Sequence, residues 1–593
     1  MSQVVKLRDI QERALKELTN RLDNYDIFSL QMPTGSGKTL VALAFRYMYD
    51  YRTLVCVRTR NQLMPYIRDA VKFFNTIPGV HLNKGRVCLY LNTEDTELIR
   101  CRSCPNYKQT AGIPPETFRR LKAALVRAVA KESLTDPYLL VDRVWGKLLG
   151  KGGDLSRIIC PYHLFRALDG KALVCTYPFL TYPHLRYYLI NYRPEIIIVD
   201  EAHNLEDAFK TGWRSITYEA IVRAREELAE YERSTGNSAK AGYYVLSLVQ
   251  SWFESINRRY GQIEEKVIDP SEYIDLAKEG NAVLEEYASL VSSIVRYKKG
   301  RYRRRRVRFF NYRILAFLDL LADVYAGVED LVLVLNKGRA ELRRYRLRRL
   351  YRQLFGPFEG SKVIMMSGTM PSANYLTKVW GIPSERFYVI DLGTRYGKFT
   401  CVINRRVSSK YEYRRKEMYY KFAKLLSGIY STARKSVLAV APSYEFAGEV
   451  GRLLSMSNMS LVVEVEGTRV GDVYERVRKG RYVIIAVAGG KLTEGVEWVG
   501  DDGSSLISDV VLLGIPYPKP TEYEELVREY ISSSSNPDLQ FLYQKERAWV
   551  LIRQAIGRAI RKKDEECTVW FLDWRYKDGW WQYRIAGLGT LRR

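Results

Sequence analysis

The chain has 593 residues, 47% of them apolar, which is enough for several domains with separate cores. Its 94 lysines and arginines exceed its 67 acidic residues, and the net charge of +27 predicts a polyanionic partner, nucleic acid before an anionic membrane surface. We see no apolar leader and no apolar run near the ~20 residues that cross a bilayer. We therefore expect a cytoplasmic protein without a membrane partner.

Short β-branched runs alternate with longer helical patterns along the chain. The first set of runs covers residues 27–31, 53–57, 171–175, 196–200 and 362–367, and the second covers residues 436–441, 482–487, 509–514 and 568–573. Near-continuous apolar strands separated by helices are typical of parallel sheets that are covered on both faces. The sequence therefore predicts an α/β fold with two parallel-sheet domains.

Two stretches interrupt the first set of strands. One carries four cysteines, and the other reads as amphipathic helix without a strand series. We predict both as insertions, the second of them helical. The expected boundaries are 1–85, 162–212 and 356–392 for the first α/β domain, 86–161 for the cysteine insertion, 213–355 for the helical insertion and 393–593 for the second α/β domain.

The helical insertion holds the densest positive charge. Residues 296–308 contain nine basic side chains and no acid, and a second basic run lies at residues 343–352. Such density is too high for pairing within one helix to offset the repulsion. The runs either contact a nucleic-acid backbone or form a solvated tip.

The segment PTGSGKT follows the first apolar run and precedes a helical pattern. This strand–loop–helix context predicts a phosphate-binding loop, in which glycines bring backbone N–H groups to the phosphates, Lys38 adds positive charge and the Thr39 hydroxyl binds Mg²⁺. Met32 stands where the full pattern has glycine. The predicted ATP-binding residues of this loop are Pro33, Thr34, Gly35, Ser36, Gly37, Lys38 and Thr39.

Two further segments carry hydrolytic chemistry. The run IIIVDEAH ends in Asp200, which is placed to hold Mg²⁺, and Glu201, which is placed to activate water. Late in the chain, QAIGRAIR puts Arg558 and Arg561 on one helical face, where they can stabilise a developing phosphate charge. Gln554 begins this segment and joins the predicted catalytic set.

Cysteines 88, 101, 104 and 160 have spacings of twelve, two and fifty-five residues. In a reducing compartment a cluster of this kind favours metal ligands over disulfides. Four thiolates can hold a [4Fe–4S] cluster or Zn²⁺. His163, just after Cys160, is a further candidate ligand that leaves zinc as an alternative. The four predicted ligands are Cys88, Cys101, Cys104 and Cys160.

These segments together resemble the xeroderma pigmentosum group D (XPD) family of superfamily 2 helicases, in its compact archaeal form. The resemblance also rests on LRDIQ, VRTRN, SGT, APSYE, GGKLTEGVE and GIPYP, which follow in the family's order. CPYH resembles the segment of the family's fourth cysteine ligand and supports iron–sulfur over zinc. The family implies two RecA-like motors, an iron–sulfur domain and a helical arch.

The resemblance also implies further site residues. Arg8 and Gln11 are expected on the adenine side of ATP, and Glu494 and Gly495 in the second motor's share of the nucleotide site. The expected DNA contacts are Arg58, Thr59, Asn61 and Tyr177, although Tyr177 can equally be a packing tyrosine.

The implied activity is an ATP-dependent 5′→3′ helicase on single-stranded and forked DNA, of the nucleotide excision repair type. It would act as a monomer near the nucleoid, with possible repair-protein partners. Two other readings stay open: a damage-recognition clamp or scaffold that grips DNA without productive unwinding, and a related iron–sulfur helicase of DinG type.

Overall fold

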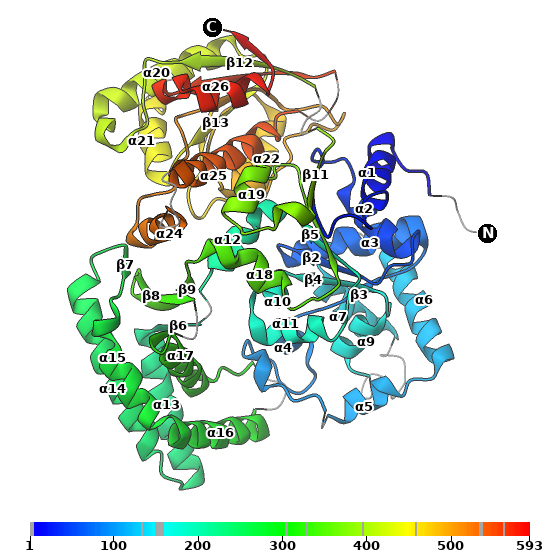
Figure 1. The fold of residues 1–593 in the computed structure, drawn as a ribbon, viewed down its shortest axis with the longest axis vertical. Coiled ribbons are helices and arrows are strands. Elements are labelled where there is room, and N and C mark those ends of the chain that lie inside the picture. Colours follow the sequence, from blue (N-terminus) through cyan, green and yellow to red (C-terminus); the bar gives the residue numbers. More distant parts are fainter. Residues whose placement is uncertain are drawn as a thin grey trace.

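The computed structural model describes most of the chain. The described residues are 5–102, 104–131, 134–148, 159–212, 214–302, 306–327, 330–393, 397–456, 459–532, 538–560, 562 and 564–592, with the backbone alone for 143–148. Within them lie two seven-stranded parallel sheets and one four-stranded antiparallel sheet. The predicted α/β class with two parallel-sheet domains is confirmed. Figure 1 shows the two parallel-sheet lobes one above the other.

The sheet of the first motor has the order β11-β1-β10-β5-β2-β4-β3. Its strands are β1 (Ile27–Gln31), β2 (Thr53–Val57), β3 (Gly79–Val80), β4 (Ala172–Thr176), β5 (Ile196–Asp200), β10 (Lys362–Ser367) and β11 (Phe387–Asp391). All residues of β1 and β2 are buried, as expected for strands covered on both faces. The five predicted strands occur within one residue of their expected bounds, and the two that were missed are the edge strands β3 and β11.

Helices cover both faces of this sheet. They are α1 (Asp9–Thr19), α2 (Lys38–Tyr47), α3 (Leu63–Phe74), α10 (Pro178–Thr181), α11 (Pro183–Ile190), α12 (Leu205–Lys210), α18 (Leu350–Phe355) and α19 (Ala373–Lys378). The loops at the carboxyl ends of β1, β2, β5 and β10 open toward the second motor, which is where ligands of open α/β sheets bind.

The second motor's sheet has the order β14-β15-β13-β16-β17-β12-β18. Its strands are β12 (Lys398–Asn404), β13 (Ser436–Ala441), β14 (Leu461–Val463), β15 (Val483–Val487), β16 (Ile507–Leu512), β17 (Glu566–Leu572) and β18 (Thr590–Arg592). Its helices are α20 (Lys416–Thr432), α21 (Tyr444–Leu454), α22 (Val470–Lys479), α23 (Lys491–Glu494), α24 (Glu522–Ser532), α25 (Asp538–Ile556) and α26 (Gly579–Ala586).

The insertion after β3 carries the cysteines. Its helices are α4 (Lys84–Val87), α5 (Pro105–Ala111), α6 (Pro115–Lys131), α7 (Pro137–Leu148) and α9 (Pro161–Ala167). Helix α6 packs on α3 of the first motor through Leu125 and Val129, which belong to the same hydrophobic core. The insertion is therefore anchored to the motor by apolar contacts as well as by the chain itself.

The second insertion forms the arm at the lower left of Figure 1. It comprises β6 (Arg214–Thr217), α13 (Tyr218–Thr235), α14 (Lys240–Tyr260), β7 (Glu265–Val267), α15 (Ile274–Ala282), α16 (Leu284–Arg301), α17 (Phe310–Tyr325), β8 (Leu331–Asn336) and β9 (Arg339–Arg344). The expectation of an entirely helical insertion was wrong, because β6, β9, β8 and β7 form an antiparallel sheet at its root.

The two insertions contact each other through ion pairs. Glu94 pairs with Arg306 and Arg313, at 2.5 and 3.1 Å, and Asp95 pairs with Arg313 at 2.9 Å. Glu97 pairs with Arg214 at 3.1 Å. An acidic stretch of the cysteine insertion therefore meets arginines of the helical arm.

Several described members of the basic runs bind partners within the protein. Lys298 is buried and pairs with Glu227 at 2.6 Å. Arg346 and Arg349 both pair with Asp330. Arg296, Arg308, Arg348 and Arg352 of these runs are exposed, so the nucleic-acid contact and the solvated tip both stay predictions, and residues 303–305 of the first run lie outside the described part of the chain.

Candidate active site and strand-binding surface

The phosphate-binding loop lies between β1 and α2. Gly35 and Gly37 have φ values of 77° and 84°, in the region that favours glycine. A Cβ on Gly37 would lie 2.2 Å from Nε2 of Gln11, so a larger residue would have to displace that amide. The loop thus keeps its backbone N–H groups accessible, as a phosphate cradle requires.

Arg8 and Gln11 support this loop from α1. The Gln11 amide donates to the carbonyl oxygens of Ser36 and Gly37, at 3.1 and 3.2 Å. The Arg8 guanidinium donates to the carbonyl of Gly35 at 3.0 Å. Both expected adenine-side residues therefore contact the loop directly.

The acidic pair lies at the carboxyl end of β5, where Asp200 is the last residue of the strand and Glu201 follows it. Lys38 Nζ lies 3.7 Å from Glu201 Oε1, and the Tyr66 hydroxyl donates to Asp200 Oδ2 at 2.9 Å. Burial and then the charge of Glu201 raise the pKa of Asp200. Burial alone would raise the pKa of Glu201, but Lys38 and Arg558 are among the charges that hold it below its usual value. Asp200 thus has the environment of a carboxylate that needs a cation, while Glu201 stays ionised.

A hydrogen-bond chain crosses from the second motor to Glu201. The Gln554 amide donates to His203 Nε2 at 2.6 Å, His203 Nδ1 lies 2.5 Å from Ser367 Oγ, and the Ser367 hydroxyl donates to Glu201 Oε2 at 3.3 Å. Burial lowers the pKa of His203 to about 4, so the ring is neutral. With Nε2 accepting, the proton lies on Nδ1, which donates to Ser367.

Arginines complete the cleft from the second motor. Arg558 donates to the carbonyls of Thr493 and Glu494, at 3.1 and 2.5 Å. Arg553 donates to Gln31 Oε1 at 2.8 Å and to the carbonyl of Met370, both in the first motor. Sequence reasoning missed Arg553, whose only signal was its place one residue before the QAIGRAIR segment. Arg561 lies outside the described residues.

Residues from both motors line one cavity of about 290 Å³ in this cleft. The described lining side chains include Thr34, Glu201, His203, Glu494, Gln554 and Arg558. Gly495 ends α23 beside Glu494. Arginines and carboxylates of both motors line this cavity together with Thr34 of the phosphate-binding loop, a set of side chains that suits a nucleotide with Mg²⁺.

Arg58, Thr59 and Asn61 are exposed on the loop after β2. Arg58 reaches across the cleft and pairs with Glu494 at 2.7 Å. Arg58, which was expected to contact DNA, and Glu494, which was expected at the nucleotide, thus form an ion pair with each other. Arg58 also borders a second cavity, described next.

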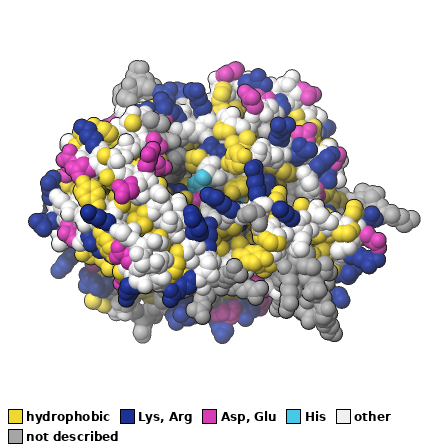
Figure 2. Space-filling model, turned by 90° about the horizontal axis from the view of Figure 1, so that it is seen from below, with side chains coloured by type: hydrophobic (Ala, Val, Ile, Leu, Met, Phe, Trp, Pro, Cys, Tyr) yellow, Lys and Arg dark blue, Asp and Glu magenta, His cyan; other side chains and the backbone are white. Residues whose placement is uncertain are grey.

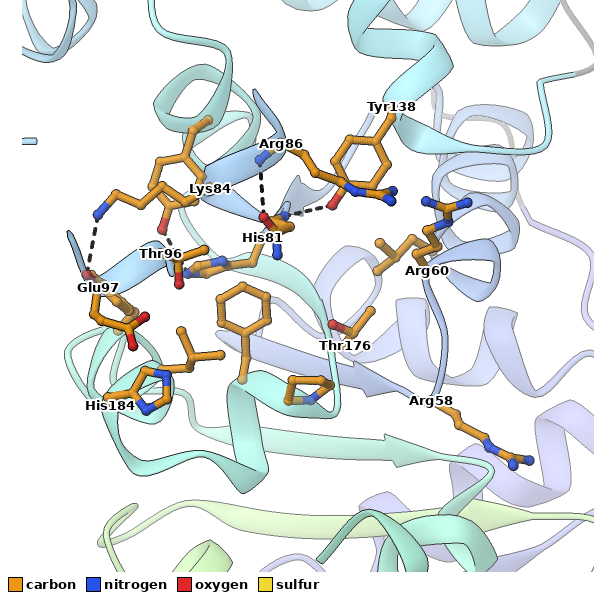
Figure 3. A pocket seen from close by; sticks show the side chains of 17 residues that line it. Arg58, Arg60, His81, Lys84, Arg86, Thr96, Glu97, Tyr138, Thr176 and His184 are labelled. Carbon is orange, nitrogen blue, oxygen red and sulfur yellow. Dashed lines mark hydrogen bonds between the residues drawn. The ribbon is translucent and has the colours of Figure 1, made fainter. Parts of the chain in front are cut away.

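The second cavity, of about 370 Å³, lies between the first motor and the cysteine insertion. Figure 3 shows Arg60, Arg86 and Tyr138 on one side of it and Lys84, Glu97 and His184 on the other. The Arg86 guanidinium lies 5.3 Å from the centre of the Tyr138 ring. Phe179 and Tyr188 add aromatic surface. Basic side chains alternate with aromatic ones, which suits a single nucleic-acid strand.

Tyr177 does not reach this cavity. Its side chain is 2% exposed, and its hydroxyl donates to the carbonyl of Asp200 at 2.6 Å. The structure therefore favours the packing alternative for Tyr177.

The four cysteines line a third cavity, of about 500 Å³. Burial raises the pKa of Cys160 to about 11 and also raises that of Cys101, and in each case neighbouring thiols add to the effect. Lys84 and Lys299 line the same cavity and bring positive charge. Buried thiols that disfavour ionisation until a cation arrives fit a metal group.

The two metal alternatives need different arrangements of these ligands. Among the described residues, no three His, Cys, Asp or Glu side chains converge closely enough to hold a single metal ion. A cubane cluster bonds each thiolate to a different iron and needs a wider cavity. Four thiols around one cavity form a donor set that suits a metal group, and the choice of a [4Fe–4S] cluster over zinc stays a prediction.

Three parts of the chain match known protein families. Residues 4–82 match the family described as Type III restriction enzyme, res subunit; residues 143–217 match the DEAD_2 family; and residues 426–587 match the family described as Helicase C-terminal domain. The ATP-dependent DNA helicase XPD of Sulfolobus acidocaldarius is 30% identical over 600 residues, which cover 99% of each chain. The chain belongs to the XPD helicase family.

Solved structures agree with this membership. A solved XPD helicase covers 99% of this chain, which in turn covers 100% of that one, with 27% identity and a TM-score of 0.71. The Xpd4 structure of S. tokodaii, at 18% identity and a TM-score of 0.64, shares the fold. The protein is thus an ATP-dependent DNA helicase with two RecA-like motors. No helix in the described ranges is long and apolar enough to span a bilayer.

Proposed function

We propose that ATP binds between the motors and is hydrolysed by Glu201. Lys38 and the loop of Gly35 and Gly37 would hold the phosphates, Thr39 and Asp200 would hold Mg²⁺, and Arg558 would stabilise charge at the γ-phosphate. Glu201 accepts the proton of the attacking water. The observation that carries this proposal is the hydrogen-bond chain from Gln554 to Glu201, which ties the base to the position of the second motor.

The DNA strand is proposed to pass the cavity beside the cysteine insertion. Arg58, Thr59 and Asn61 lie on the loop that leads toward it, and Arg60 and Arg86 line it. Figure 2 shows many lysine and arginine side chains on one face of the molecule, beside a hollow near its centre, which fits a polyanionic partner. Phosphates would meet these cations while bases stack on the aromatic rings.

The cysteine cavity is proposed to hold a [4Fe–4S] cluster, with Cys88, Cys101, Cys104 and Cys160 as ligands. When bound, the cluster supplies covalent cross-links between segments with little apolar core of their own. The residues of the insertion would then present a rigid edge beside the strand. A broad absorbance near ~400 nm, together with iron in the purified protein, tests this.

The reaction is proposed to be unwinding in the 5′→3′ direction by a monomer on nucleoid DNA, within a repair pathway of the excision type. The test compares a duplex with a 5′ single-stranded tail to one with a 3′ tail, each with ATP and Mg²⁺. Unwinding of the 5′-tailed substrate alone is expected. Unwinding of the 3′-tailed substrate would contradict the polarity, and hydrolysis without unwinding of either would support the clamp alternative.

A further inference from the structure

Arg58 is shared by the two cavities that the proposed function assigns to DNA and to the nucleotide. It follows β2 of the first motor, and it lines both the cavity beside the cysteine insertion and the cleft between the motors. Figure 3 shows its guanidinium directed away from the other labelled side chains of the first of these cavities. One exposed cation therefore borders both proposed ligand sites.

Glu494 of the second motor holds Arg58 in this position. Its Oε2 accepts a hydrogen bond from Arg58 Nη1 at 2.7 Å, and the two side chains are 20% and 39% exposed. The ion pair joins the two motors across the cleft. Because it is partly open to solvent, a ligand of Arg58 can reach it without unfolding anything.

The same glutamate contacts Arg558 through its main chain. Helix α23 is a single turn that ends at Glu494, and Arg558 donates to the carbonyls of Thr493 and Glu494, at 3.1 and 2.5 Å. The end of this short helix is therefore held by two arginines, one from the DNA side and one from the nucleotide side.

A carboxylate and a DNA phosphate are rival partners for one guanidinium. Both are anions that accept charge-assisted hydrogen bonds from its N–H groups. A phosphate that approaches Arg58 also meets the negative charge of Glu494, which lies 2.7 Å from the Arg58 nitrogen. Each anion therefore weakens the binding of the other.

We propose that Glu494 competes with the DNA backbone for Arg58, so that strand binding releases this glutamate at the end of α23, where Arg558 is held. This inference rests on the strand path proposed above, in which Arg58 contacts DNA. Glu494 is a positioning residue in this role, because it acts on DNA through Arg58. The ion pair gives the nucleotide cleft a means of responding to an occupied strand cavity.

The test is a double-mutant cycle on the affinity of the full-length protein for single-stranded DNA, measured by fluorescence anisotropy without nucleotide. Glu494→Gln keeps the shape of the side chain but removes its charge, so affinity should rise by about two- to fivefold, the strength of one exposed ion pair. Arg58→Ala should lower affinity. In the Arg58→Ala background, Glu494→Gln should bring no further gain.

Glu449→Gln is the matched control, because it removes the same charge from an exposed ion pair with Arg452 elsewhere on the second motor. Its affinity should equal that of the wild type. An equal gain from Glu494→Gln with and without Arg58 would be a general charge effect and would overturn the competition.

The remaining outcomes separate this inference from the strand path. Wild-type affinity in Arg58→Ala would remove Arg58 from the path, and this inference with it. Weaker binding in Arg58→Ala together with wild-type affinity in Glu494→Gln would overturn the competition alone. Weaker binding in Glu494→Gln would show that the glutamate presents Arg58 to DNA, which is the opposite of the proposed role.

Discussion

Glu201 has a φ of 53°, a left-handed conformation that non-glycine residues seldom adopt. Such backbone strain persists where the surrounding structure determines it, and here Asp200 Oδ1 accepts a hydrogen bond from the Glu201 N–H at 3.0 Å. The conformation turns the carboxylate toward Lys38 and Ser367. The position of this base is therefore set by both backbone and side-chain contacts.

Replacing this base should separate nucleotide binding from turnover. In Glu201→Gln the shape is kept but proton abstraction is lost, so steady-state ATP hydrolysis should fall by about 10²- to 10⁴-fold while ATP affinity stays near the wild-type value. Glu412→Gln, at an exposed position, is the control. Wild-type turnover in Glu201→Gln would show that another group is the base.

The hydroxyl of Tyr66 should matter through Asp200. Tyr66→Phe removes the hydrogen bond that orients this carboxylate, so the Mg²⁺ concentration for half-maximal hydrolysis should rise ~10-fold. Tyr192→Phe is a matched control in the same domain, because its hydroxyl donates to the carbonyl of Thr53 at 3.2 Å, away from the acidic pair. An unchanged Mg²⁺ dependence in Tyr66→Phe would place the cation elsewhere.

Among single residues, the sequence predicted those site residues that lie close together in one short segment. PTGSGKT and DEAH needed only a strand and a turn to bring their side chains to the cleft. Tyr177 and Arg553 could not be assigned in the same way. The burial of Tyr177 and the reach of Arg553 across the cleft both depend on how elements that are distant in the sequence pack together.

Helix α24 of the second motor contacts two other parts of the molecule. Glu522 accepts hydrogen bonds from Lys266 Nζ, at 2.9 Å, and from the Val267 N–H, at 3.1 Å, on strand β7 of the arm. Glu524, on the same helix, pairs with Lys210 at 3.1 Å and with Arg547 at 3.0 Å. One helix of the second motor thus contacts the arm and the first motor.

Breaking this buried network should destabilise the interface between the motors. Lys210→Met removes one of the two cations beside the largely buried carboxylates of Glu206 and Glu524 and leaves Arg547 alone to pair with both, at a cost of about 2 kcal/mol or more. Calorimetric unfolding measures this. Arg120→Ala removes an exposed pair with Glu116 and should cost less than about 1 kcal/mol. Equal effects of the two substitutions would mean that the buried network does not hold the motors together.

Strand β9, in the small sheet of the arm, shows why a strand of this insertion was missed. Strand β9 reads RAELRR, and only its burial pattern, with Ala340, Leu342 and Arg344 inside, has the period of a strand. Arg344 is buried because its guanidinium donates to the carbonyls of Phe209 and Thr181. A buried arginine with acceptors from distant segments cannot be recognised from composition, whereas the apolar strands of the two motors can.

On the scale of the whole molecule, the surplus positive charge should govern DNA affinity. With ~6 phosphate contacts, affinity for single-stranded DNA should fall on the order of 10³-fold between 50 and 200 mM salt. Arg86→Ala, in the proposed strand path, should reduce the slope of this dependence by about one counterion. Fluorescence anisotropy at several salt concentrations measures the slope.

The control for this experiment is Arg452→Ala, which removes an exposed arginine that pairs with Glu449 on the second motor. Its slope should equal that of the wild type. If Arg86→Ala also kept the wild-type slope, the cavity beside the cysteine insertion would not lie on the strand path.

The central claim is that the two motors hydrolyse ATP by themselves and that the cysteine insertion converts their motion into strand separation. Cys101→Ser tests it most directly, with DNA-stimulated hydrolysis and unwinding measured on one preparation. The motors fold around their own sheets, so hydrolysis should remain, while the insertion loses its cross-link and unwinding should be largely abolished. Normal unwinding without the metal group, or loss of both activities together, would contradict this division of roles.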